Sequence, residues 1–157
     1  MRIAYRTLAY LIAAGVFVQA AAIAFAVFTI AHQIDAGSVL SSSSADNAGQ
    51  VVHGVVGLMV IPALAIIFLI VSYFAKVPDG VTWAAIVFGL VALQIALAFV
   101  AFNAPIVGAL HGMNALAIVW VAFRAASKVT PVPLSAADVA EAEGRSIIRR
   151  RSRSTSV

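Results

Sequence analysis

Residues 51–75 read VVHGVVGLMVIPALAIIFLIVSYFA, an apolar run in which His53 is the only side chain that titrates near neutral pH. A helix rises about 1.5 Å per residue, so a run of this length can cross a hydrocarbon core about 30 Å thick. Three further runs of similar character occupy residues 8–30, 81–102 and 104–126. The sequence therefore predicts an all-α fold, a four-transmembrane-helix up-down bundle.

The composition of the chain agrees with this class. Hydrophobic residues make up 63% of the 157 residues and charged residues only 10%, which excludes an ordinary soluble domain. The first apolar run is longer than the core of a signal peptide and lacks a clear cleavage site, so we expect a retained helix. Residues 1–127 are predicted to form the transmembrane domain and residues 128–157 a tail.

Cationic residues indicate the orientation of the bundle. They precede the first run, lie between the second and third, and follow the fourth: Arg2, Arg6, Lys76, Arg124 and Lys128. Residues 31–50 and Asn103, in the two other connections, bring no Lys or Arg. By the positive-inside rule, both termini are expected in the cytoplasm, for a multi-pass protein of a bacterial plasma membrane.

The two halves of the chain share a pattern that suggests a tandem repeat of two helical hairpins. In each half a glutamine in one span (Gln19 or Gln94) is followed in the next span by a histidine-glycine pair. Short connections favour antiparallel neighbours, so the second and fourth spans should face each other diagonally. His53 and His111 would then lie at similar depth in the outer leaflet.

A histidine inside a membrane span is by default a candidate site. Imidazole is a strong iron ligand, so His53 and His111 are candidate metal ligands for b-type haem (haem b) held across the bundle. Small residues around the histidines would admit the flat macrocycle: Gly54, Gly57, Gly108, Gly112 and Ala115. Alternatively, each histidine bonds a neighbouring helix and the small residues only permit close packing. A zinc site that adds His32 is a further alternative.

Gln19 and Gln94 lie near the midplane of the membrane. They would either line the same cavity, where they would hold a quinone or the haem edge, or form hydrogen bonds to other helices.

All six carboxylates lie outside the spans, which argues against a proton-coupled transporter. The chain has no cysteine, which excludes covalent haem attachment, and no nucleotide-binding or hydrolase motif. These absences favour a non-enzymatic role.

The pattern of Gln19, His53-x3-Gly57, Gln94 and His111-x2-Asn114 resembles an uncharacterised family of small four-helix actinobacterial membrane proteins. Residues 1–127 also resemble one four-helix half of haem A synthase. This resemblance implies that His53 and His111 take the positions of paired haem ligands. Because only one half is present, without outer-loop catalytic groups, it implies a haem-binding or electron-transfer subunit. A structural or assembly subunit of a membrane complex and a lipid or quinone binder remain the alternatives.

Other features of the chain yield local predictions. Pro62 predicts a kink in the second span, and Asn103 before Pro105 suggests a cap for the fourth. In the tail, residues 128–134 suggest an extended segment and residues 135–144 a brief helix, and residues 145–157 are expected to be disordered from their composition. Four arginines are expected to meet anionic lipids at the membrane surface: Arg149, Arg150, Arg151 and Arg153.

Overall fold

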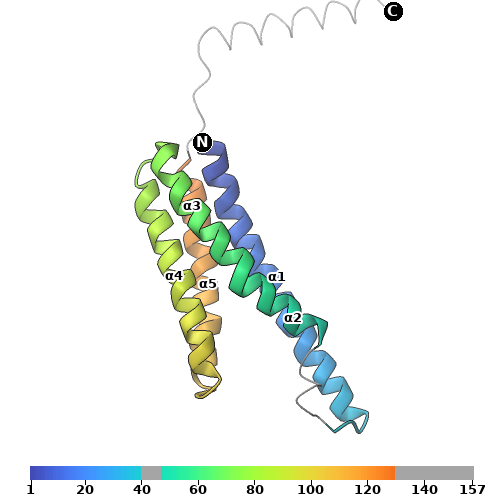
Figure 1. Cartoon of the computed structure of the whole chain (residues 1–157). Coiled ribbons are helices and arrows are strands. Elements are labelled where there is room, and N and C mark those ends of the chain that lie inside the picture. Colours follow the sequence, from blue (N-terminus) through green and yellow to red (C-terminus); the bar gives the residue numbers. More distant parts are fainter. Residues whose placement is uncertain (40–46, 130–157) are drawn as a thin grey trace, which may run out of the picture.

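The computed structural model describes residues 1–39 and 47–129, and the regular secondary structure in those ranges is helical (Figure 1). The elements are α1 (Arg2–Asp35), α2 (Ala48–Val55), the π-helical turn η2 (Val56–Val60), α3 (Ile61–Ala75), α4 (Gly80–Ala101) and α5 (Val107–Ser127). Because α2, η2 and α3 form one continuous helix, four helices are long and apolar enough to cross a membrane. The predicted all-α four-helix fold is confirmed. The arginine cluster and brief helix expected in the tail lie outside the described residues.

The helices alternate in direction, and we name the two ends of the bundle by their residues. The basic end holds Arg2, Arg6, Lys76, Arg124 and Lys128, and the loop end holds residues 36–39 and 102–106. The first hairpin is α1 with α2, η2 and α3, and the second hairpin is α4 with α5. Helix α1 packs against α3 and α5, and α4 also packs against α3 and α5. The second and fourth spans therefore lie on one diagonal, as predicted.

The two hairpins pack closely towards the basic end and diverge towards the loop end (Figure 1). The largest fully buried side chains are Tyr5, Phe68, Ile12, Ile118 and Val87. The Tyr5 and Phe68 rings lie 4.6 Å apart, and the Tyr5 hydroxyl donates a hydrogen bond of 3.0 Å to the Gly80 carbonyl. This buried contact joins α1, α3 and the start of α4, so it fixes the hairpins to each other at the basic end.

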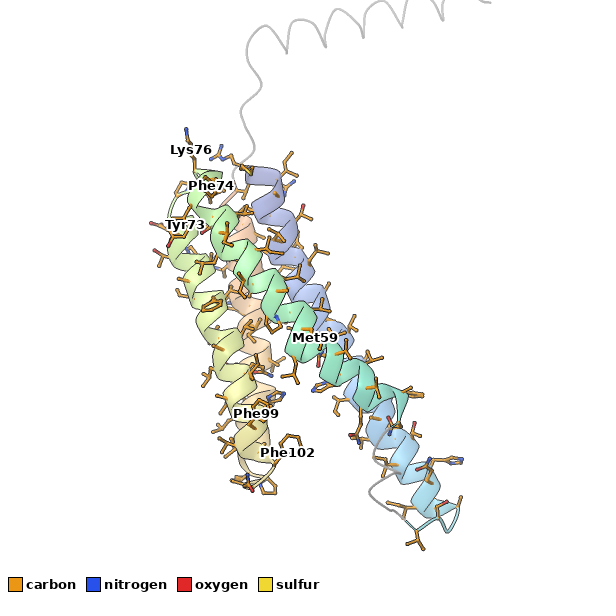
Figure 2. The ribbon with its side chains drawn as sticks, in the orientation of Figure 1. Met59, Tyr73, Phe74, Lys76, Phe99 and Phe102 are labelled. Carbon is orange, nitrogen blue, oxygen red and sulfur yellow. The ribbon has the colours of Figure 1, made fainter. Side chains whose placement is uncertain are left out.

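Most of the remaining apolar side chains point away from the bundle. Figure 2 shows Met59, Tyr73 and Phe99 projecting outwards, and all three are well over half exposed. Such a surface would be unfavourable in water, whereas lipid chains solvate it without cost. The chain is a small, multi-pass integral membrane protein.

Three helix boundaries differ from those expected. Helix α1 extends beyond residues 8–30 at both ends, because polar residues can continue a helix after its apolar part has left the membrane. Helix α5 begins at Val107 with Ile106 as its cap residue, so the expected cap by Asn103 is wrong. Pro105 disfavours the helical conformation at Ala104, which prevents a helix from starting directly after Asn103.

The irregularity that Pro62 predicts takes the form of η2. Proline has no amide hydrogen and its ring crowds the carbonyl four residues earlier, here Leu58, within this turn. A π turn contains one more residue than an α turn and is often found near functional sites. It lies between His53 and Pro62, so it sets the direction in which His53 leaves the helix.

Candidate functional site

The structure brings the two intramembrane histidines together. The imidazole ring centroids of His53, on α2, and His111, on α5, lie 6.3 Å apart with an interplanar angle of 53°. Both residues are half-buried. They come from opposite corners of the bundle, so the pair spans the space between the two hairpins.

Each imidazole is held by a main-chain carbonyl of its own hairpin. His53 Nδ1 lies 3.1 Å from the Gln19 carbonyl oxygen, and His111 Nδ1 lies 3.0 Å from the Gln94 carbonyl oxygen. A carbonyl oxygen can only accept, so Nδ1 donates in both contacts, and the neutral ring keeps a free lone pair on Nε2. No hydrogen bond to either Nε2 is found within residues 1–39 and 47–129. This is the usual state of a metal-binding histidine.

The glutamine side chains take different partners in the two hairpins. Gln19 Nε2 donates a 2.9 Å hydrogen bond to the His53 carbonyl, so these two residues bond each other in both directions. Gln94 Oε1 instead accepts a 2.6 Å hydrogen bond from Asn114 Nδ2. Both glutamines therefore bond a neighbouring helix, as one of the two readings of the sequence expected.

The small residues around the histidines do not share one role. A Cβ atom on Gly57 would lie 3.3 Å from the Gln19 amide, so this glycine makes room for that side chain. Gly54 and Gly112, each directly after a histidine, have no other atom within 4 Å of such a Cβ, and Gly108 approaches only Ala101. Ala115 packs against the hydrophobic core. The structure therefore has room for a side chain at Gly54 and at Gly112, and Gly112 lies on an exposed part of α5.

Asn114, which belongs to the sequence pattern His111-x2-Asn114 but was given no role from the sequence, is a polar residue of the site. It is 8% exposed, and its Nδ2 also donates a 2.9 Å hydrogen bond to the Leu90 carbonyl. Asn114 follows His111 by three residues, whereas Gly57 follows His53 by four, yet each lies beside the glutamine of its hairpin. Positions three and four residues after a helical residue lie on the same face, so both spacings bring the residue to the same side of its helix. The available signal was an amide one helical turn after a histidine inside a span.

Charge and metal ligands are sparse around the pair. No group of three or more His, Cys, Asp or Glu side chains that could hold a metal occurs in the described part of the chain. His32 therefore does not join His53 and His111, and the three-histidine zinc alternative is not assembled. The Asp79–Lys128 ion pair, at 3.9 Å, lies at the basic end. The arrangement offers two imidazole side chains whose ring centroids lie 6.3 Å apart.

No known protein family, curated protein or solved structure matches this chain.

Proposed function

We propose that His53 and His111 are the two axial ligands of a b-type haem and that the protein is a haem-binding, electron-transfer subunit of its membrane. The observation that carries this proposal is the separation of the rings. A metal–imidazole bond of about 2.0–2.1 Å plus about 1.2 Å from the nitrogen to the ring centre would place two imidazoles on opposite sides of one metal roughly 6.4–6.6 Å apart, centre to centre. The two ring centroids lie 6.3 Å apart.

The hydrogen bonds at Nδ1 support the same role. Metal-ligating histidines almost always donate their second ring N–H to a carbonyl, carboxylate or water, which fixes the ring and strengthens the ligand. The Gln19 and Gln94 carbonyls do this for His53 and His111. Helix bundles commonly hold cofactors between side chains of facing helices. The pair therefore matches iron ligation in tautomer as well as in distance.

The polar groups that would meet the haem propionates include no lysine or arginine. His32, Gln33 and Asn103 lie towards the loop end, where the described residues include no Lys or Arg. The propionates would rely on these side chains, on main-chain amides and on water.

Two protein ligands determine the class of chemistry. A haem iron bound by both histidines would supply one-electron transfer. His53 and His111 would hold the metal, and the Gln19 and Gln94 carbonyls would keep the rings in place through Nδ1. This combination favours an electron carrier over an oxygenase.

An absorption spectrum of the detergent-purified protein, expressed with haem supplied, tests the proposal. We expect a Soret band in the wild type, its loss in His53→Ala and in His111→Ala, and its retention in Tyr73→Phe, a control on the exposed surface near the basic end. A folded but colourless wild type would contradict haem binding and leave an assembly role. Full haem content in either histidine variant would contradict ligation by this pair.

We also infer that the basic end faces the cytoplasm. Its cations fit the positive-inside rule, and the tail arginines would add contacts to anionic lipids worth about 1 kcal/mol each near the surface. Because the chain has no cysteine, single cysteines at positions 76 and 103 can be labelled from either side of the membrane. Labelling of position 103 from outside and of position 76 only after permeabilisation is expected; the reverse would overturn the orientation.

A further inference from the structure

We propose that Asn114 is a positioning residue for the His111 ligand, acting through α4; this inference rests on the proposed haem site. The hydrogen bonds that Asn114 makes within the described part of the chain go to α4 and not to either imidazole. Asn114 bonds the helix that carries the acceptor of the His111 Nδ1 proton, and it does so one helical turn from His111.

The acceptor itself is a main-chain oxygen, so its position depends on how α4 lies against α5. Asn114 Nδ2 donates to Leu90 O at 2.9 Å and to Gln94 Oε1 at 2.6 Å. Leu90 and Gln94 are four residues apart and so share one face of α4. These two bonds fix the rotation and register of α5 at the turn where the Gln94 carbonyl meets His111.

The placement of an amide here argues for a specific role. Asn114 lies on the same buried face of α5 as Ile118 and Val121, where an aliphatic side chain would pack without polar cost. A polar group inside a membrane helix is costly unless it is paired, and interhelical hydrogen bonds contribute little to stability on average. Stability alone is a weak reason for an amide at this position.

In the first hairpin, His53 is positioned without an asparagine. There Gln19 both accepts from the His53 ring and donates to the His53 carbonyl, and Gly57 leaves the space that the glutamine amide needs. In the second hairpin the Gln94 amide is held by Asn114 instead. Changes at Asn114 should therefore loosen His111 and leave His53 in place.

The experiment compares haem-loaded variants of the full chain. Asn114→Leu is expected to retain haem about 10–100-fold more weakly, the usual effect of losing an outer-shell partner, and to shift the midpoint potential. It should also change the electron paramagnetic resonance spectrum, which depends on how the two imidazole planes are held. Gln94→Met, which removes only the Gln94–Asn114 bond, should produce a smaller change in the same direction.

Tyr5→Phe is the matched control, because it removes one buried interhelical hydrogen bond at the basic end, remote from the histidines. It should lower stability without changing haem affinity, potential or resonance spectrum. If Asn114→Leu does not fold, Gln94→Met decides. Variants that lose stability as Tyr5→Phe does but keep wild-type affinity and potential would overturn the positioning role while haem binding stands. A colourless wild type would instead overturn the haem site, and this inference with it.

Discussion

The two hairpins present the same histidine–carbonyl contact on helices of different length. The helices of the first hairpin contain 34 and 28 residues, and those of the second contain 22 and 21. At a rise of about 1.5 Å per residue, the second hairpin is roughly 32 Å long and matches a bilayer core, whereas the first reaches roughly 42–51 Å. A long apolar hairpin fits the same thickness by tilting. This accounts for the lean of α1 and α2 away from α4 and α5 (Figure 1).

The hairpins also differ in how they hold the histidine. The first uses a π turn, a glycine and a glutamine that bonds His53 twice, and the second uses a regular helix and Asn114. In both, the ring nitrogen Nδ1 donates to a main-chain carbonyl at 3.0–3.1 Å. The shared feature is therefore the backbone acceptor, and the side chains around it differ between the hairpins.

Among the variants that test how the two hairpins differ, deletion of Leu58 should have the largest effect on haem binding. Removing one residue from η2 converts the π turn to an α turn, which changes the position and direction of α2 relative to α3. His53 would then leave the Gln19 carbonyl and the space shared with His111. We expect the haem spectrum to be lost as completely as in His53→Ala. Leu58 is 52% exposed, so Leu58→Ala is a fair control and should retain the spectrum. Normal haem content after the deletion would show that η2 does not set the direction of His53.

Close packing of α1 on α2 is the next feature to test. A Cβ atom on Gly49 would overlap the Ala22 carbonyl oxygen and lie 2.8 Å from the Ala26 nitrogen, and neither backbone atom can move independently. Gly49→Ala should lower the free energy of unfolding by about 1–3 kcal/mol, the usual cost of overpacking. Gly89, in the second hairpin, has no atom within 4 Å of such a Cβ, so Gly89→Ala should be neutral or stabilising by up to about 1 kcal/mol. Unfolding of both variants in one detergent checks the pair, and equal losses would contradict the contact.

Most of the fold could be predicted from the sequence because the bilayer restricts the choice. Apolar runs of the right length must be helices, and short connections make neighbours antiparallel. The diagonal that brings His53 and His111 together follows from those two facts. The candidate pair could likewise be predicted, because few polar groups occur inside the spans and each needs a partner.

The remaining details depend on tertiary contacts that spacing alone does not reveal. Pro62 predicts a local interruption of the helix, but whether the helix bends or forms a π turn there depends on the residues that pack around it. Gly57 and Gly54 look alike in the sequence, yet Gly57 makes room for the Gln19 side chain and Gly54 faces open space. The role of Asn114 became visible only once α4 was placed beside it. Residues that act through a neighbouring helix are therefore the ones that sequence reasoning missed.

The smallest expected effect is on stability, and it should differ between Asn47 and Asn103, the two asparagines at the loop end. Asn47 Oδ1 accepts a 3.2 Å hydrogen bond from the Gln50 amide, which caps α2, and Asn47 Nδ2 donates at 3.2 Å to the Ala26 carbonyl on α1. Asn103 is exposed and caps no helix. Asn47→Ala should therefore lower the free energy of unfolding by about 0.5–2 kcal/mol, the usual cost of losing a cap. Asn103→Ala should change it by less than about 0.5 kcal/mol.

Asn47 precedes His53 by six residues, about 9 Å along α2, and Gln19 bonds His53 directly. The Asn47→Ala variant should therefore unfold more easily while its haem spectrum stays that of the wild type. Equilibrium unfolding followed by circular dichroism, with the absorption spectrum recorded on the same samples, measures both quantities. A spectral change in this variant would mean that the Asn47 hydrogen bonds help to hold His53. The first hairpin would then position His53 through contacts along its half near the loop end, and not through Gln19 alone.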